Sequence, residues 1–99
     1  MAKVALLVQL HAKPGKSAEV AEFLESARPL ALQEAQTVSW YAVQLGEDRF
    51  AIFDTFNDDD GRQAHLAGPI AAALMGRADE LLAASPKIEL ATVLADKIA

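Results

Sequence analysis

The stretch FAIFDTF, residues 50–56, decides the fold that this sequence predicts. Successive side chains of a strand point to opposite faces, so positions 50, 52, 54 and 56 share one face and positions 51, 53 and 55 share the other. Both faces are largely apolar, with Asp54 as the one charged residue. A strand with one solvent-exposed face would alternate polar with apolar residues. This strand is therefore expected to need cover on both sides.

The segment before this strand completes a hairpin. Residues 37–45 are rich in β-branched and aromatic residues, which favour strands. Residues 46–48, Gly-Glu-Asp, are typical of a short turn. Residues 37–45 and 50–56 are therefore predicted to pair antiparallel.

The segment after residues 50–56 is predicted to form two helices. Asn57 is the expected N-cap of the first, and the acidic run 58–60 would lie where the helix dipole favours negative charge. Gly68-Pro69 ends this helix and begins the next, because proline is tolerated in a first turn. The second helix is expected to stop near Ser85-Pro86.

The two ends of the chain supply the remaining elements. Residues 3–11 and 87–95 read as strands, the first closed by a Pro-Gly turn. From Ser17, the expected N-cap, apolar residues recur with helical period, and Pro29 is expected to kink this helix before a last turn at residues 30–35. The order βαββαβ predicts an α+β, ferredoxin-like fold: a four-stranded antiparallel sheet with helices on one face, in a single domain spanning residues 1–99.

Apolar residues on the second face of this sheet predict a homodimer. In strand 3–11, Ala5 and Leu7 point to the face opposite the one that carries most of its apolar residues. In strand 87–95, Ala91 and Val93 likewise point to the second face. One helix layer covers one face only, and open apolar patches of several hundred Å² are rare on monomers. Two sheets packed face to face would bury on the order of 800 Å² per partner. The alternative is a monomer with an apolar exposed face.

Composition narrows the choice of partners and cofactors. The net charge of −5 argues against a nucleic-acid partner, which would need clustered positive charge. The absence of cysteine excludes disulfides and thiolate sites, and it suits a cytoplasmic protein. No apolar run is long enough for a membrane span, and the run near the N-terminus is too short for a signal peptide. No metal-site spacing or phosphate loop occurs, so we expect neither a metal nor another cofactor.

Asp54 and His65 are the candidate catalytic residues. A carboxylate within an apolar strand is costly unless it is paired. His65 lies on the helix that directly follows this strand, so both side chains could face one cavity between sheet and helices. A carboxylate that orients an imidazole makes a general base. The alternative is an ion pair between Asp54 and Arg62, with His65 merely filling space.

Aromatic and cationic residues nearby are the candidate substrate contacts: Trp40, Phe53, Phe56 and Arg62. Trp40 and Tyr41 are consecutive strand residues, so one would contact the helices and the other the partner subunit. The sequence leaves open which of the two faces the pocket. Packing in the aromatic core is the alternative role for both.

The sequence resembles the antibiotic-biosynthesis-monooxygenase-type proteins. The resemblance covers about residues 4 to 95 and rests on residues 50–56, the acidic run, GRQAHL at 61–66, Gly68-Pro69 and the KPGK turn at 13–16. It implies a dimeric α+β barrel. Some members of that family oxygenate electron-rich polycyclic phenols or quinols without metal or flavin. A deprotonated aromatic can give an electron to oxygen, so such a protein need supply only a dry aromatic pocket and a base.

The resemblance places Asp54 at the acidic strand position of the family and His65 at its helix histidine. Two positions depart from the family pattern. A tryptophan often follows two residues after the acid, where this chain has Phe56 and therefore lacks an indole N–H donor. A second histidine often follows the proline, where this chain has Ile70.

Relatives that degrade haem also resemble this fold. They need an axial histidine on the later helix, where this chain has Met75, and an asparagine in the first strand, where it has Val8. Haem degradation is therefore not expected.

Two functions follow from these observations. The first is a cofactor-independent monooxygenase of a small electron-rich aromatic, with His65 as base, Asp54 and Arg62 orienting it, and aromatic side chains lining the pocket. The second is a non-catalytic dimer that binds a small apolar ligand.

Overall fold

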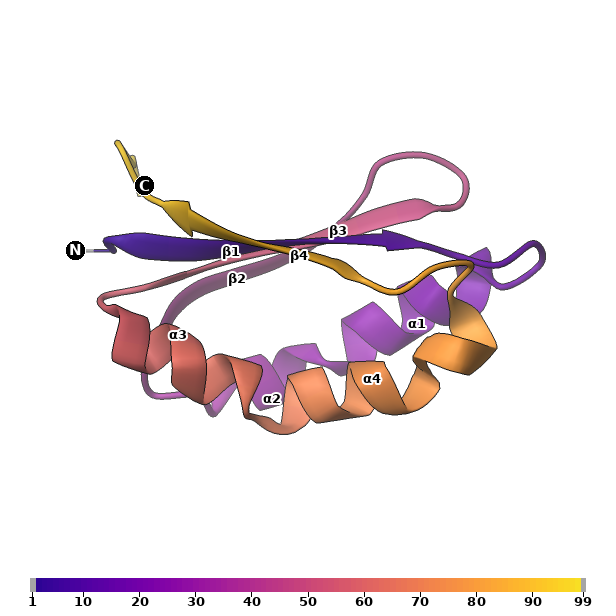
Figure 1. Ribbon diagram of the computed structural model, residues 1–99, viewed down its shortest axis with the longest axis horizontal. Coiled ribbons are helices and arrows are strands. Elements are labelled where there is room, and N and C mark those ends of the chain that lie inside the picture. Colours follow the sequence, from indigo (N-terminus) through magenta and orange to yellow (C-terminus); the bar gives the residue numbers. More distant parts are fainter. Residues whose placement is uncertain (1, 99) are drawn as a thin grey trace.

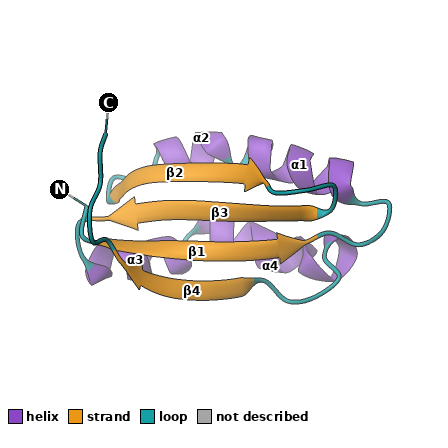
Figure 2. Ribbon diagram, turned by 90° about the horizontal axis from the view of Figure 1, so that it is seen from above, coloured by secondary structure: helices purple, strands orange, loops and turns teal. Residues whose placement is uncertain are grey.

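A computed structural model describes residues 2–98, and in it one antiparallel sheet carries all the helices on a single face (Figures 1 and 2). The strand order is β2-β3-β1-β4. The strands are β1 (Val4–His11), β2 (Thr37–Gln44), β3 (Arg49–Phe56) and β4 (Lys87–Thr92). The helices are α1 (Ser17–Ser26), α2 (Arg28–Leu32), α3 (Asp59–Leu66) and α4 (Pro69–Leu81). This arrangement confirms the α+β, ferredoxin-like prediction.

The strand register decides which side chains face the helices. Trp40, Asp54, Leu6 and Leu90 lie directly opposite one another across the four strands, so they form one row on the same face. Asp54 and Leu6 in the middle of this row are fully buried. Burial of the apolar side chains on this face provides the main driving force for packing the helices against it. The core therefore surrounds a carboxylate.

The first helical region differs from the prediction, because it is two helices rather than one kinked helix. α1 ends at Ser26, and Pro29 lies in the first turn of α2, where its missing N–H costs no hydrogen bond. Ser17 is the first helical residue and not the N-cap. Lys16 holds that position, because its N–H closes the preceding turn on the carbonyl of Lys13 at 2.9 Å.

Asp58 caps α3, so the prediction of Asn57 as the cap is wrong. The carboxylate of Asp58 accepts a hydrogen bond of 2.9 Å from the N–H of Gly61, and its backbone is extended. The acidic run thus supplies both the cap and the first-turn charges of α3. Two elements also end before the predicted residue: α4 ends at Leu81, before Ser85-Pro86, and β4 ends at Thr92, before residue 95.

Replacing Asp58 with alanine is expected to lower the free energy of unfolding by about 0.5–2 kcal/mol, because α3 loses its side-chain cap. Asp60→Ala is the matched control, since Asp60 lies in the same turn and offers only its charge to the helix dipole. Urea unfolding of both variants measures the difference. An equal loss in the two would show that the cap bond does not set the stability of α3.

Candidate functional site

Asp54 lies at the centre of the helix-facing side of the sheet. Its side chain is 0% exposed, and Trp40 and Leu6 flank it on the neighbouring strands. Neither carboxylate oxygen has a hydrogen bond of good geometry. A buried carboxylate without donors is costly unless an opposite charge compensates it.

His65 supplies that charge from α3. Its Nε2 lies 2.8 Å from Oδ2 of Asp54, an ion-pair contact whose angle is unsuited to a hydrogen bond. Its Nδ1 lies 2.7 Å from Oε1 of Glu34 and makes a hydrogen bond there. The imidazole is 8% exposed. Glu34, His65 and Asp54 therefore form a row, which we call the carboxylate–imidazole array.

Glu34 is the member of the array that sequence reasoning missed. It lies in the segment between α2 and β2, 31 residues before His65. Thr37 holds it in place by donating a hydrogen bond of 2.8 Å to Oε1, while Oε2 is buried without a partner. No motif in a single sequence links positions so far apart, and no signal in this one could have found the contact.

Burial has the largest effect on the pKa of His65 and lowers it, but the two carboxylates together outweigh burial. The close contacts and negative charges of Asp54 and Glu34 hold the pKa above its ordinary value of 6.5. Phe56 packs against the imidazole with ring centroids 5.4 Å apart and is fully buried. The two carboxylates thus favour the protonated form of the imidazole between them.

Two glycines let α3 and the start of α4 approach the segment that carries Glu34. A Cβ on Gly61 would lie 3.2 Å from the side chain of Gln36, tighter than ordinary contacts. A Cβ on Gly68 would lie 3.2 Å from the carbonyl oxygen of His65 and 3.5 Å from Oε2 of Glu34. The missing Cβ of Gly61 allows α3 to pack closely against the segment that carries Glu34, and the missing Cβ of Gly68 relieves a contact with the last turn of α3.

Two spaces adjoin the array. The larger is a cavity of about 840 Å³ between α1–α2 and β2, and its wall includes Glu34, Thr37 and Trp40. The smaller is a hollow of about 160 Å³ whose wall includes Glu34, Thr37 and His65. Glu34 and Thr37 line both spaces and so stand between them.

The structure separates the predicted aromatic contacts. Trp40 faces the helices and lines the large cavity, and its indole Nε1 is buried without a partner. Phe56 and Phe53 line neither space, contrary to the expectation. Phe56 is enclosed behind His65, and Phe53 points to the opposite face of the sheet, where it is 39% exposed. Tyr41 also borders the large cavity, but its side chain shares the opposite face of the sheet with Phe53, so of these two consecutive residues Trp40 is the one on the helix-facing side. Phe50 is a further aromatic residue of the cavity wall.

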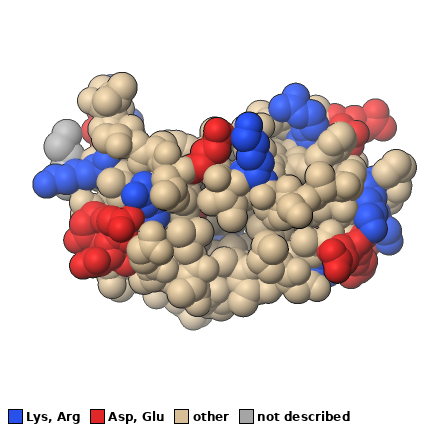
Figure 3. Space-filling view, in the orientation of Figure 1, with Lys and Arg blue, Asp and Glu red and all other residues tan. Residues whose placement is uncertain are grey.

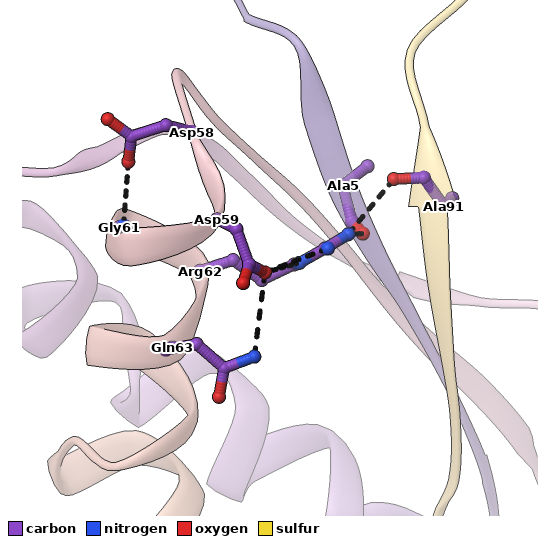
Figure 4. A network of polar contacts seen from close by, with 7 residues as sticks. All are labelled: Ala5, Asp58, Asp59, Gly61, Arg62, Gln63 and Ala91. Atoms are coloured by element: carbon purple, nitrogen blue, oxygen red, sulfur yellow. Dashed lines mark hydrogen bonds and ion pairs between the residues drawn. The ribbon is translucent and has the colours of Figure 1, made fainter.

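Arg62 contacts Asp59, Ala5 and Ala91 and makes no ion pair with Asp54, so the structure supports neither the alternative Asp54–Arg62 pair nor a role for Arg62 in orienting the base. Its guanidinium donates to Asp59 at 2.9 and 3.0 Å, and its Nη1 donates to the carbonyl oxygens of Ala5 and Ala91 (Figure 4). The side chain thus reaches β1 and β4 and connects α3 to the sheet there. Arg62 therefore has a structural role, and His65 is the residue that pairs with Asp54.

The described residues also bear on metals, membranes and charge. Within residues 2–98 no group of three or more His, Asp or Glu side chains is arranged to hold a metal ion, and the array is a row without a common centre. None of the helices described is both long and apolar enough to cross a membrane. On the face in Figure 3, basic and acidic side chains lie near one another at both ends, and the acidic ones at the left end lie over the start of α3. Tan surface lies between the two ends over the rest of the helix layer.

The fold is that of the antibiotic-biosynthesis-monooxygenase-type proteins. A Nitrosomonas europaea protein provisionally named an antibiotic biosynthesis monooxygenase superposes with a TM-score of 0.83 at 14% identity, over 93% of this chain and 99% of that one. A Chloroflexus aurantiacus protein with the same provisional name has a TM-score of 0.74 at 16% identity, over 96% of each chain. At these identities the likeness shows a shared fold.

The chain belongs to the same family as a protein of unknown function from Nitrosomonas europaea. The two are 52% identical over 100% of this chain and 96% of that one, with a TM-score of 0.98. No protein-family model matches the chain, and no curated protein does.

The array predicts that stability depends on pH through His65. The folded-state pKa lies above the ordinary 6.5, so the contribution of protonated His65 is fully present below about pH 6.5 and is lost as pH rises through the folded-state value. The urea midpoint of the wild type minus that of His65→Gln should therefore shrink from mildly acidic to alkaline pH. His11→Gln is the control, because His11 pairs with Asp48 on the surface. A difference that grows with pH would contradict the assignment.

Proposed function

We propose that this protein is a cofactor-independent monooxygenase that acts on a small electron-rich aromatic of the phenol or quinol type. The observation that supports this most is the buried carboxylate–imidazole array beside an 840 Å³ cavity. Asp54 and His65 form the base system of this proposal. Trp40 contributes an aromatic wall and a free indole N–H.

The chemistry needs only the substrate, oxygen and a base. In an anthrone, removal of a proton from the ring system leaves an electron-rich anion that can pass an electron to oxygen. The methylene carbon then gains one oxygen atom as a new carbonyl, while its two hydrogens leave with the second oxygen atom as water. Atoms and electrons balance without an external reductant. A positioned base contributes typically about 10²–10⁴-fold to such a step.

A second candidate is a non-catalytic protein that binds a small apolar ligand. One observation favours it: His65 and Asp54 are absent from the wall of the large cavity, and His65 reaches the small hollow only. A ligand in the cavity would then meet Trp40 and Glu34 without direct access to the histidine. Oxygen consumption separates the two candidates.

We also propose that the chain acts as a homodimer paired through the open face of the sheet. Figure 2 looks onto this face, and no helix covers it. Tyr41 is 55%, Val43 44% and Phe53 39% exposed there. The chain beyond β4 rises on this side of the sheet, and Leu94 in it is 96% exposed (Figure 1). A second copy laid on this face would bury these apolar side chains.

Oxygen uptake with a panel of anthrones and quinols tests the monooxygenase. Wild type should consume oxygen with at least one of them, and His65→Gln should lower kcat/KM by about 10²–10⁴-fold. The pH profile of wild-type turnover should contain the titration of His65, which the variant lacks. His11→Gln should behave as wild type. Binding reported by the single tryptophan, Trp40, with no oxygen uptake would favour the second candidate instead.

Light scattering tests the dimer. The wild type should have twice the 10.6 kDa mass of one chain. Phe53→Glu should give the monomer, because it buries a charge in the proposed interface. Met75→Glu is the matched control, since Met75 on α4 is 57% exposed on the other side of the molecule and should leave the mass unchanged. A wild-type monomer would refute the pairing.

A further inference from the structure

Most polar side chains on the wall of the large cavity are held by partners within the protein. The hydroxyl of Thr37 donates to Glu34 at 2.8 Å. The hydroxyl of Ser39 shares a hydrogen bond of 2.6 Å with that of Thr55. The amide of Gln44 donates to a carbonyl oxygen in the turn before β3 at 3.4 Å. These groups already satisfy one another, so a ligand must be recognised by other residues of the wall.

Arg28 is the wall residue that a ligand can reach and that attracts an anion. Oε2 of Glu34 and Nε1 of Trp40 have no hydrogen-bond partner, but both atoms are buried and so are closed to a ligand in the cavity. Arg28 is exposed, and within residues 2–98 its guanidinium makes neither a hydrogen bond nor an ion pair. It is also the only Lys or Arg that lines the cavity in this part of the chain. The wall thus offers a ligand one free positive charge.

Glu25 is the other exposed charge on this wall, and it does not neutralise Arg28. The two residues are three positions apart, a spacing at which side chains of one helix can pair. Here α1 ends at Ser26 and α2 begins at Arg28, so the two residues belong to different helices, and no ion pair joins them. The guanidinium of Arg28 therefore keeps its donors free.

The rest of the wall indicates the size and shape of the ligand. Leu24 and Phe50 are buried apolar residues of the wall, and Trp40 adds a second aromatic ring. A volume of about 840 Å³ is in the range of cavities that hold drug-sized molecules. A guanidinium binds a carboxylate through two parallel hydrogen bonds. The cavity therefore combines apolar and aromatic walls with one anion-binding group on its exposed side.

We infer that the large cavity binds a flat aromatic carboxylic acid, whose carboxylate pairs with Arg28 while its rings lie against Phe50 and Trp40. Because Arg28 is exposed, the carboxylate stays near solvent and the rings enter the cavity. The inference rests on the proposed function for oxidation of the ligand, and it deepens that function by placing an acidic group on the phenol or quinol. Binding of the acid rests on the cavity wall alone.

Calorimetric titration with 2-naphthoate and 2-naphthamide tests the inference, because the two ligands share their rings and differ in charge. Wild type should bind the naphthoate more tightly, and added salt should weaken this preference. Arg28→Gln should lower the affinity for naphthoate about 3–30-fold, between the effect of an exposed ion pair and that of a hydrogen bond to a charged group. The affinity for naphthamide should change less.

Three further variants control for charge and packing. Arg49→Gln removes an exposed positive charge outside the cavity wall, and it should bind naphthoate as wild type does. Glu25→Gln makes the opposite change of charge on the same wall, and it should bind naphthoate at least as tightly. Arg28→Lys keeps the charge without the planar fork, and its affinity should lie between those of wild type and Arg28→Gln.

Three results would overturn the inference. The first is equal affinity of wild type for naphthoate and naphthamide. The second is a loss of naphthoate affinity in Glu25→Gln or Arg49→Gln as large as that in Arg28→Gln, because the loss would then not come from pairing with Arg28. The third is no binding of either ligand to wild type.

Oxygen uptake separates this inference from the proposed function. An anthrone carboxylic acid should have a lower KM than anthrone, and Arg28→Gln should raise the KM of the acid more than that of anthrone. Selective binding of naphthoate through Arg28, with no oxygen uptake from any anthrone or quinol, would overturn the monooxygenase and support the acid site. Oxygen uptake from anthrone, with naphthoate bound no better than naphthamide, would support the monooxygenase and overturn the acid site.

Discussion

The ion pair between Asp54 and His65 is the constraint on which the site depends. A carboxylate at the centre of a buried sheet face loses its hydration, and only a protonated partner within contact distance compensates it. Replacing a buried ion pair with apolar residues is often neutral or stabilising in other proteins. Stability alone therefore gives a weak reason for an acid in this strand. A chemical role for the pair accounts better for its position.

This pair fixes the parts of the fold around it. His65 lies over Asp54, near the end of β3, and α3 begins soon after that strand with Asp58 as its cap. Glu34 must then approach from the other side, which requires close packing of the α2–β2 segment against Gly61 and Gly68. The large cavity remains where α1 and α2 diverge from β2. The array and the cavity are thus two results of one packing arrangement.

The features that depend on the local periodicity of apolar residues could be predicted from the sequence. Strand alternation and turn signals gave the βαββαβ order, and the helix after residues 50–56 brought His65 to Asp54. The same alternation excludes Phe53 from the cavity, since it neighbours Asp54 and must point to the opposite face. The alternation of residues 50–56 alone thus places Phe53 away from the cavity.

The contact of Glu34 with His65 and the partners of Arg62 could not be predicted from a single sequence. Glu34 meets His65 only because α1 ends at Ser26 and a separate short helix redirects the chain, whereas a single kinked helix offers no such placement. Arg62 precedes His65 by about one helical turn, and from the sequence it could equally have paired with Asp54. Its long side chain instead donates to the carbonyl oxygens of Ala5 in β1 and Ala91 in β4. The position of the end of a flexible side chain depends on such tertiary partners.

The open sheet face and the array belong to opposite sides of one layer. Tyr41 and Phe53 project from one side, while Trp40 and Asp54 project from the other. A partner that covers the open face would therefore add no side chain to the array, and the residues that meet a ligand would come from one chain. Pairing could still act on the cavity through β2, because this edge strand carries Tyr41 on one face and Trp40 on the other. On this argument the proposed chemistry would be a property of the single chain, while the proposed pairing would support the strand that forms the cavity wall.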